Sequence, residues 1–203
     1  MERDTYKTIV KPSEEVLFKD KNSKFFGFAF PITSEEEVKS CLTNLKKSHH
    51  AARHWCYAYQ LGTETVRYRV NDDGEPSNSA GQPIYGQIQS FDVTNILVVV
   101  VRYFGGVKLG VGGLINAYRT AAQLALEAST IVERTINVKF RLLFDYKNMN
   151  KVMRIIKERQ INITEQRLEL RCEIDISVRK NDAQAIFDLF EQLFEIDIKK
   201  LDS

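Results

Sequence analysis

The chain has 203 residues, of which 43% are hydrophobic and 28% charged, and its formal net charge is only +2. This composition is typical of an ordinary globular protein, and it lacks the apolar run of roughly 20 residues that a membrane-spanning helix needs. Because the chain is not basic overall, any contact with nucleic acid must depend on a local patch of cations.

The first part of the chain alternates between strand and helix patterns. Residues 17–32 predict two strands around a polar turn at 21–24. A helix is expected from Ser34, where Ser34 and Glu37 form a capping box ahead of an apolar stripe. Aromatic and β-branched residues at 55–61 and 65–70 predict a hairpin. A polar loop over 71–83 is expected to follow.

Residues 96–126 form the most informative stretch: a buried apolar strand, a glycine-rich turn and a helix that we expect from about Leu114 to Ser129. Five of the ten glycines lie between 105 and 113, which predicts backbone angles or close approaches that a side chain would forbid. Free N–H groups and partial positive charge at the start of a helix suit a phosphate. The predicted phosphate- or nucleic-acid-binding residues are Arg102, Gly105, Gly106, Lys108, Gly110, Gly112, Gly113 and Arg119.

A purely structural interpretation of the same glycines stays open, because they would also let the helix pack closely on the sheet. The turn is not a Walker A loop, since no Gly-Lys-Ser/Thr follows, and it lacks the acidic residue of the dinucleotide fingerprint. The nearby Tyr103, Phe104 and Tyr118 favour binding, because base stacking combines well with phosphate contacts.

The histidine and acidic residues ahead of this stretch offer two further kinds of chemistry. The acids of the 71–83 loop do not follow calcium-loop spacing, and its Asp-Gly and Pro-Ser pairs favour tight turns, so we predict no metal and no cofactor. His54 and Cys56 would need a third orienting group to form a nucleophile pair, so no catalytic residue is predicted. The possible site-lining residues are His54, Asp72, Asp73, Glu75 and Tyr103.

The pattern changes near residues 133–137, which predicts one domain over 1–135 and a second over 136–203. In the second domain, strand and helix patterns alternate in the order βαββαβ, the split βαβ or ferredoxin-like arrangement. The expected strands are 138–145, 161–166, 168–178 and 196–199, and the expected helices are 147–159 and about 182–195. The whole chain is therefore predicted to be α+β.

Three segments together resemble the YigZ/IMPACT family in order and spacing: ARHWCYAYQLG (52–62), DDGEPSNSAGQPI (72–84) and VVVRYFGGVKLGVGGLINAY (99–118). The resemblance covers roughly residues 17–130, although the family usually has Gly-Thr where this chain has Asn78-Ser79. It implies a first domain similar to domain two of a small-subunit ribosomal protein and to domain IV of the translocation elongation factor. It also implies a second domain similar to domain V of that factor.

The resemblance also shapes the expected function. Eukaryotic relatives regulate translation through an initiation-factor kinase and use an extra N-terminal domain, which this chain is expected to lack, so that kinase role is not carried over. Some relatives carry a peptidase label, but no dinuclear metal ligand set supports it here. We therefore expect a non-catalytic RNA-binding protein linked to translation or the ribosome, with no membrane partner.

The few, widely spaced cysteines and the polar N-terminus predict a cytoplasmic location for this protein. Two alternatives for the function stay open. One is a small-molecule enzyme, a hydrolase or transferase that acts on a phosphorylated substrate with His54 or an acid of the 72–75 segment as base. The other is a protein-interaction module that regulates translation.

Overall fold

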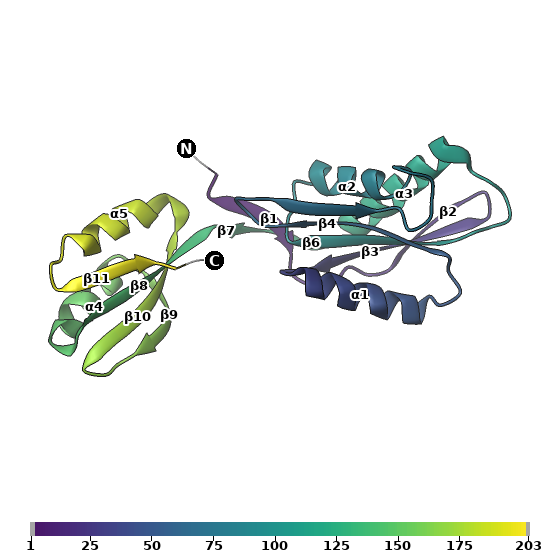
Figure 1. Cartoon of the computed structure of the whole chain (residues 1–203). Helices are drawn as coiled ribbons and strands as arrows, with labels where there is room; N and C mark the ends of the chain where they lie inside the picture. Colours follow the sequence, from purple (N-terminus) through teal and green to yellow (C-terminus); the bar gives the residue numbers. More distant parts are fainter. Residues whose placement is uncertain (1–2, 202–203) are drawn as a thin grey trace. The chain divides into compact units, whose positions relative to one another are not determined.

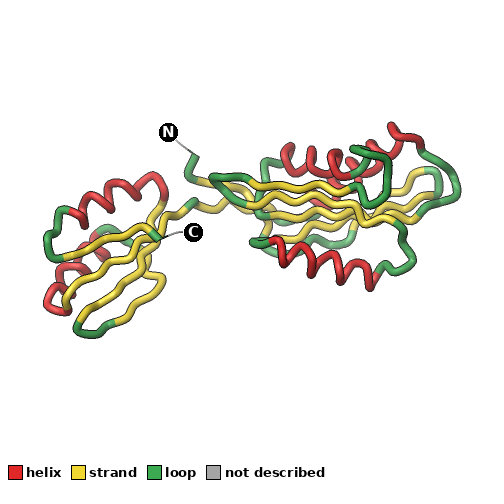
Figure 2. Tube along the Cα trace, in the orientation of Figure 1, coloured by secondary structure: helices red, strands yellow, loops and turns green. Residues whose placement is uncertain are grey.

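The computed structural model describes residues 3–201 and divides into two compact units (Figure 1). One unit spans Tyr6–Arg134, and the other comprises residues 135–201 together with residues 3–5. Each unit combines helices with a sheet, as the tube in Figure 2 shows. The chain therefore mixes helices with antiparallel sheets, and each unit is described by itself below.

The Tyr6–Arg134 unit is built on a five-stranded antiparallel sheet. In sheet order its strands are β2 (Val16–Asp20), β3 (Ser23–Pro31), β6 (Ile96–Tyr103), β4 (His54–Leu61) and β5 (Arg67–Asn71). The central strand β6 is apolar from Ile96 to Val101, because helices cover both faces of the sheet. Helix α1 (Glu35–Ser48) lies on one face, and α2 (Gly81–Ser90) and α3 (Gly110–Glu127) lie on the other (Figure 1).

Helix α1 begins where its capping signal predicted, because the Ser34 side chain accepts a hydrogen bond from the Glu37 amide. Two other elements of this unit differ from the sequence prediction. Helix α2 was not expected at all, and α3 begins at Gly110, one turn before the predicted Leu114. A separate two-stranded sheet of β1 (Thr5–Ile9) and β7 (Ile131–Thr135) was also not predicted.

The second unit contains a four-stranded antiparallel sheet with the strand order β11-β8-β10-β9. The predicted element order βαββαβ is present, with a short 3-10 turn (Tyr146–Asn148) before the first helix. Its elements are β8 (Asn137–Asp145), α4 (Met149–Glu158), β9 (Asn162–Arg167), β10 (Arg171–Arg179), α5 (Lys180–Glu191) and β11 (Ile196–Lys200).

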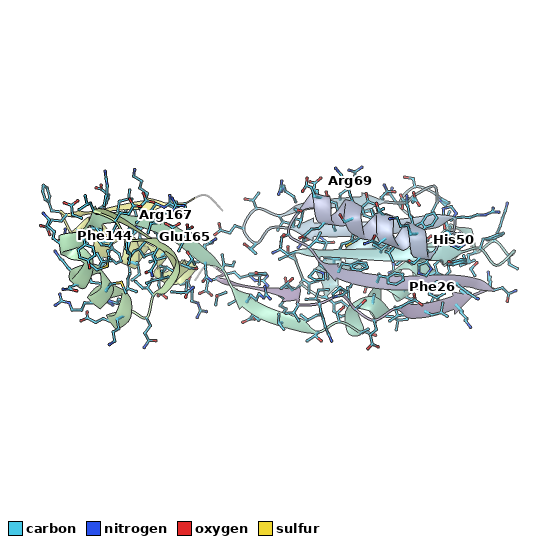
Figure 3. All side chains as sticks on the ribbon, turned by 90° about the horizontal axis from the view of Figure 1, so that it is seen from below. Phe26, His50, Arg69, Phe144, Glu165 and Arg167 are labelled. Carbon is cyan, nitrogen blue, oxygen red and sulfur yellow. The ribbon has the colours of Figure 1, made fainter. Side chains whose placement is uncertain are left out.

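Strand β10 begins at Arg171 rather than at the predicted Leu168, because residues 168–170 form the turn from β9. Alternate residues of β8 and β10 pack against α4 and α5, and most of the residues between them are charged and lie on the other face. On that charged face, Arg141 binds both carboxylate oxygens of Asp175 at 2.7 and 2.8 Å. Glu165 and Arg167 extend from the neighbouring strand β9 (Figure 3).

Within the described residues, no helix has the length and apolar character needed to cross a bilayer.

Candidate nucleic-acid interface

Three side chains from neighbouring strands form a row across the sheet, on the face covered by α3. Arg102 of β6 pairs in register with His54 of β4 on one side and with Phe25 of β3 on the other. Side chains alternate along a strand, so Arg102 shares its face with the core residues Val98 and Val100. The Arg102 guanidinium carbon lies 5.5 Å from the centre of the Phe25 ring.

Glu75 brings a buried carboxylate to this row from the loop between β5 and α2. Its Oε1 accepts hydrogen bonds from Arg102 Nη1 at 2.6 Å and from the Tyr118 hydroxyl at 2.7 Å. The His54 Nε2 atom lies 4.0 Å from the same oxygen. The Glu75 and Arg102 side chains are only 4% and 7% exposed, and such charges are tolerated because each neutralises the other.

The two aspartates of this loop hold its shape. The carboxylate of Asp72 accepts hydrogen bonds from three amides, those of Asn78, Ala80 and Gly81, and so caps α2. The carboxylate of Asp73 accepts a hydrogen bond from the Trp55 amide of β4. The backbone carbonyl oxygen of Asp73 accepts one from His54 Nδ1 at 2.8 Å. Both carboxylates are therefore occupied by hydrogen bonds from backbone amides. The described residues contain no cluster of three metal-ligating side chains.

The glycine-rich turn follows Arg102 and leads into α3. Gly105 is required by space, because a Cβ there would lie 2.1 Å from the backbone of Asn22. Its amide donates to the Ser23 hydroxyl, so it is not open to a ligand. Gly106 and Gly110 have positive φ angles, +87° and +76°, which favour glycine.

The start of α3 leaves several amides open. The first residue before the helix, Leu109, offers no side-chain cap. The first four N–H groups of a helix have no partner inside it, so the amides of residues 109–112 are unpaired there. The amide of Gly113 is the first that bonds within the helix. Gly110, Val111 and Gly112 are exposed residues, so the first turn of α3 lies at the surface.

A pocket of about 320 Å³ lies between this helix start and the Glu75 loop, and we call it the α3 pocket. It is lined by Glu75, Pro76, Arg102, Phe104, Lys108, Leu109, Gly110, Val111 and Leu114. Most of the lining is apolar, with Lys108 exposed at its edge. The Nε atom of Arg102 is buried and has no hydrogen-bond partner within residues 3–201. The pocket thus has an apolar wall, two cations and the carboxylate of Glu75, and it lies beside the open start of α3.

Not every predicted site residue reaches the α3 pocket. Tyr103 points to the opposite face of the sheet, where its hydroxyl lies 3.0 Å from His49 Nδ1 beside α1. Arg119 is exposed more than two turns further along α3 and does not line the pocket. His54 lies behind the pocket, next to Glu75. The wall residues Leu109, Val111 and Leu114 were missed, because their apolar character alone does not distinguish a pocket from a core.

Cys56 and Tyr118 lie beneath the pocket in the core. The Cys56 thiol donates to the carbonyl oxygen of Asp72 at 3.0 Å and lies 3.3 Å from the Tyr118 hydroxyl. Burial raises the pKa of the Cys56 thiol and of the Tyr118 hydroxyl far above their usual values. A thiol nucleophile must be ionised, so this environment does not suit Cys56 for catalysis.

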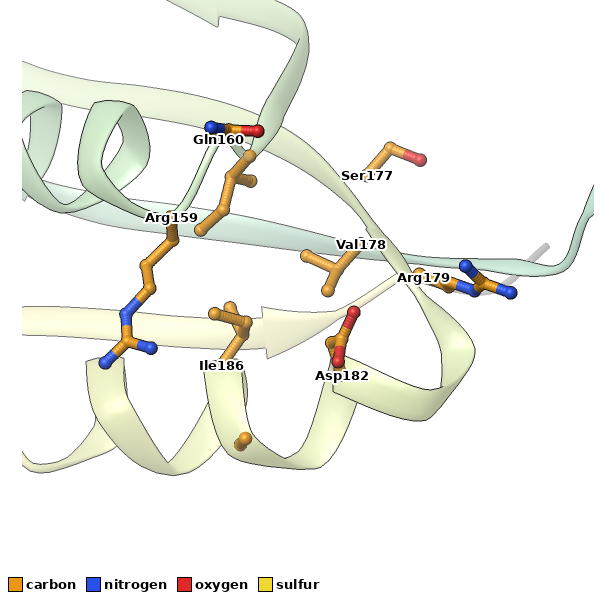
Figure 4. A pocket seen from close by; sticks show the side chains of 9 residues that line it. Arg159, Gln160, Ser177, Val178, Arg179, Asp182 and Ile186 are labelled. Carbon is orange, nitrogen blue, oxygen red and sulfur yellow. The ribbon is translucent and has the colours of Figure 1, made fainter. Parts of the chain in front are cut away.

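A second pocket of about 320 Å³ lies in the other unit, between the end of α4, β10 and the start of α5 (Figure 4). Arg159 and Arg179 flank it, and Asp182 lies between them (Figure 4). Arg179 already forms an ion pair with Asp4. The carboxylate of Asp182 and the ion pair of Arg179 therefore reduce the positive charge of this pocket.

The chain matches the family model "Impact N-terminal domain" over residues 21–126, which is more than half of its length. It belongs to the Impact family. An IMPACT family member of Haemophilus influenzae is 32% identical over 86% of this chain and 86% of its own length. All residues that line the α3 pocket fall inside the matched Impact domain.

Two solved structures are similar to this Impact family chain. The crystal structure of a hypothetical protein has a TM-score of 0.72 and 22% identity, with 99% of each chain covered, and therefore shares the fold. The structure of Yih1, described as a two-domain translational regulator, is 28% identical and has a TM-score of 0.38. That match covers 59% of this chain and 46% of Yih1.

Proposed function

We propose that this Impact family protein binds RNA through the α3 pocket, in a role linked to translation. The open start of α3 beside two cations is the observation that carries the proposal. An RNA phosphate would accept hydrogen bonds from the amides of Gly110 and Val111, which line the pocket, and of the adjacent Gly112. The helix dipole adds partial positive charge there. Lys108 would supply a full charge from the edge of the pocket, and Arg102, whose charge Glu75 cancels in part, would add to it from the wall.

The link to translation rests on the family resemblance. The resemblance likens the first unit to domain two of a small-subunit ribosomal protein and to domain IV of an elongation factor. It likens the second unit to domain V of that factor. We further propose that the two units are separate domains that meet near residue 135, and that the protein works in the cytoplasm. The geometry of the α3 pocket carries the RNA proposal.

The open sheet face of the second unit is a poor competitor for this role. Arg141 on this face is neutralised by acids, because it binds Asp175 and lies 3.9 Å from Glu173. At the α3 pocket, by contrast, Lys108 forms no ion pair within residues 3–201. A phosphate backbone would have to displace these carboxylates before it could bind there. The proposal therefore assigns RNA to the Impact domain.

Binding of an unstructured RNA strand at a series of salt concentrations tests the proposal. Affinity should fall as salt rises, because cations that neutralise phosphates release counterions. Lys108→Ala should weaken binding and reduce the slope of log affinity against log salt by about 0.7 to 1. Arg119→Ala is the matched control, since it removes an exposed cation of the same unit outside the pocket. A flat salt response, or equal effects of both variants, would contradict the proposal.

A further inference from the structure

We infer that the α3 pocket holds a single unpaired nucleotide, with its phosphate at the start of α3 and its base against Phe104. The protein would then select single-stranded over double-stranded RNA. This inference rests on the proposed function and specifies which form of RNA the same site accepts.

The size and shape of the pocket limit what can enter it. A volume of about 320 Å³ lies at the lower end of the range for small-molecule sites, which suits one nucleotide. The bases of a duplex are stacked and paired inside the helix, so a duplex would present phosphates, sugars and base edges to the pocket mouth but not the face of a base. Filling the pocket therefore requires a base that is free to leave the stack.

The wall of the pocket is suited to a base. The Phe104 side chain is 47% exposed and Val111 is 53% exposed, although both are large and apolar. The Arg102 guanidinium carbon lies 5.5 Å from the centre of the Phe104 ring, where a cation–π contact helps to hold that ring in place. Aromatic rings held in this way are the platforms on which single-stranded nucleic acids stack, whatever their base sequence.

The charges of the pocket point to the same conclusion. The guanidinium of Arg102 is paired with the carboxylate of Glu75. Among the residues that the structure describes, Lys108 is therefore the one cation of the pocket lining that is exposed and carries no paired acid. A protein that binds duplex by its phosphates needs several free cations along its surface. With so little free charge, stacking has to provide a large part of the affinity.

Arg102 adds an observation that is independent of the helix start. Its side chain is only 7% exposed and lines the pocket, and its Nε–H lacks a partner within the described chain. A buried donor without an acceptor is unusual in a folded protein. A bound phosphate or base edge, with a small shift of the guanidinium, would provide that acceptor.

Fluorescence anisotropy with the full chain tests the inference on three labelled probes: an unstructured RNA strand, the same strand annealed to its complement, and a nucleoside monophosphate. We expect the duplex to bind at least about 10-fold more weakly than the strand, as the loss of base stacking predicts. Phe104→Ala should weaken binding of the single strand by a similar factor and abolish the preference for strand over duplex. Phe104→Tyr should keep both the affinity for the strand and that preference. Phe194→Ala is the control, because it removes a fully exposed phenylalanine of the other unit.

The outcomes separate this inference from the proposed function. Equal binding of strand and duplex, still sensitive to Lys108→Ala, would overturn the inference and leave RNA binding in place. No binding of either RNA would overturn both. Binding of the monophosphate as tight as that of the strand would identify a small-nucleotide site and also contradict the inference. Loss of strand binding in Phe194→Ala would place the stacking platform elsewhere.

Discussion

Oε1 of Glu75 lies 2.6 Å from Nη1 of Arg102 beneath the α3 pocket, and both side chains are more than nine-tenths buried. Each charge is stable there only because the other is present. The pair also sets the charge that a ligand meets, since the carboxylate cancels part of the positive charge of Arg102. The same contact therefore supports the fold and weakens the site.

The variant Glu75→Gln should separate these two effects. Loss of the carboxylate leaves Arg102 uncompensated, so the free energy of unfolding should fall by about 3 kcal/mol. RNA affinity should rise, because the full charge of Arg102 becomes available to phosphate. Urea unfolding and RNA binding at low temperature measure the two changes.

Tyr118→Phe is the control for that experiment. It removes the hydroxyl that donates to Glu75 and keeps the charge pair. The free energy of unfolding should therefore fall by about 1 kcal/mol, and RNA affinity should stay unchanged. A rise in affinity with Tyr118→Phe equal to that with Glu75→Gln would contradict the role given to the Glu75 charge.

Two glycines of the 105–113 stretch should respond in opposite ways to alanine. At Gly105 the new Cβ would meet the backbone of Asn22, so unfolding should become easier by at least about 2 kcal/mol. At Gly112 nothing lies within 4 Å of the new Cβ, and alanine favours a helix by about 1 kcal/mol over glycine. Gly112→Ala should therefore unfold at equal or higher urea concentration. If Gly112→Ala destabilised the protein more than Gly105→Ala, the close approach of Gly105 to Asn22 would be contradicted.

The sequence predicted best those elements whose signal is local. Strand β6 begins with a run of six apolar residues, and α1 carries both a capping box and an apolar stripe. The start of α3 was misplaced, because the glycines at 110, 112 and 113 have low helix propensity and hide its first turn. Helix α2 was missed because three of its ten residues, Gly81, Pro83 and Gly86, normally interrupt helices.

Tertiary contacts explain the rest of the difference between prediction and structure. The cap of α2 comes from Asp72, which lies eight and nine residues before the amides that it binds at the helix start. No local pattern reports such a contact. The approach of Glu75 to Arg102, 27 residues apart, likewise depends on the whole sheet. The sequence could therefore name the charged residues of the site but could not pair them or separate Tyr103 and Arg119 from them.

The thiols provide a test of the non-catalytic interpretation. Cys56 and Cys172 are fully buried, and burial raises the pKa of Cys56 well above its usual value. Only the partly exposed Cys41 should react with a thiol reagent in the native protein at pH 8, and all three should react in denaturant. Cys41→Ser should remove the native reaction. Rapid labelling of Cys56 instead would favour the enzyme alternative.

The second unit should lose stability in acid through Asp175. The hydrogen bonds and charge of Arg141 hold the pKa of this carboxyl below its usual 3.8. Because the folded pKa is the lower one, the stabilisation is complete above about pH 4 and is lost as pH falls through the folded value. Asp175→Asn should flatten this acid dependence, as followed by NMR signals of β10 during urea unfolding. Asp145→Asn changes an exposed carboxylate of β8 and should leave the dependence of stability on acid pH unchanged.

The most direct test of the central claim is the NMR response of the amides that begin α3. During titration with an unstructured RNA strand, the signals of Gly110, Val111 and Gly112 should shift progressively and saturate together. The amide of Gly105, which already donates to Ser23, should shift less. Saturable RNA binding that leaves the signals of residues 110–112 unchanged would contradict the account and place the interface elsewhere.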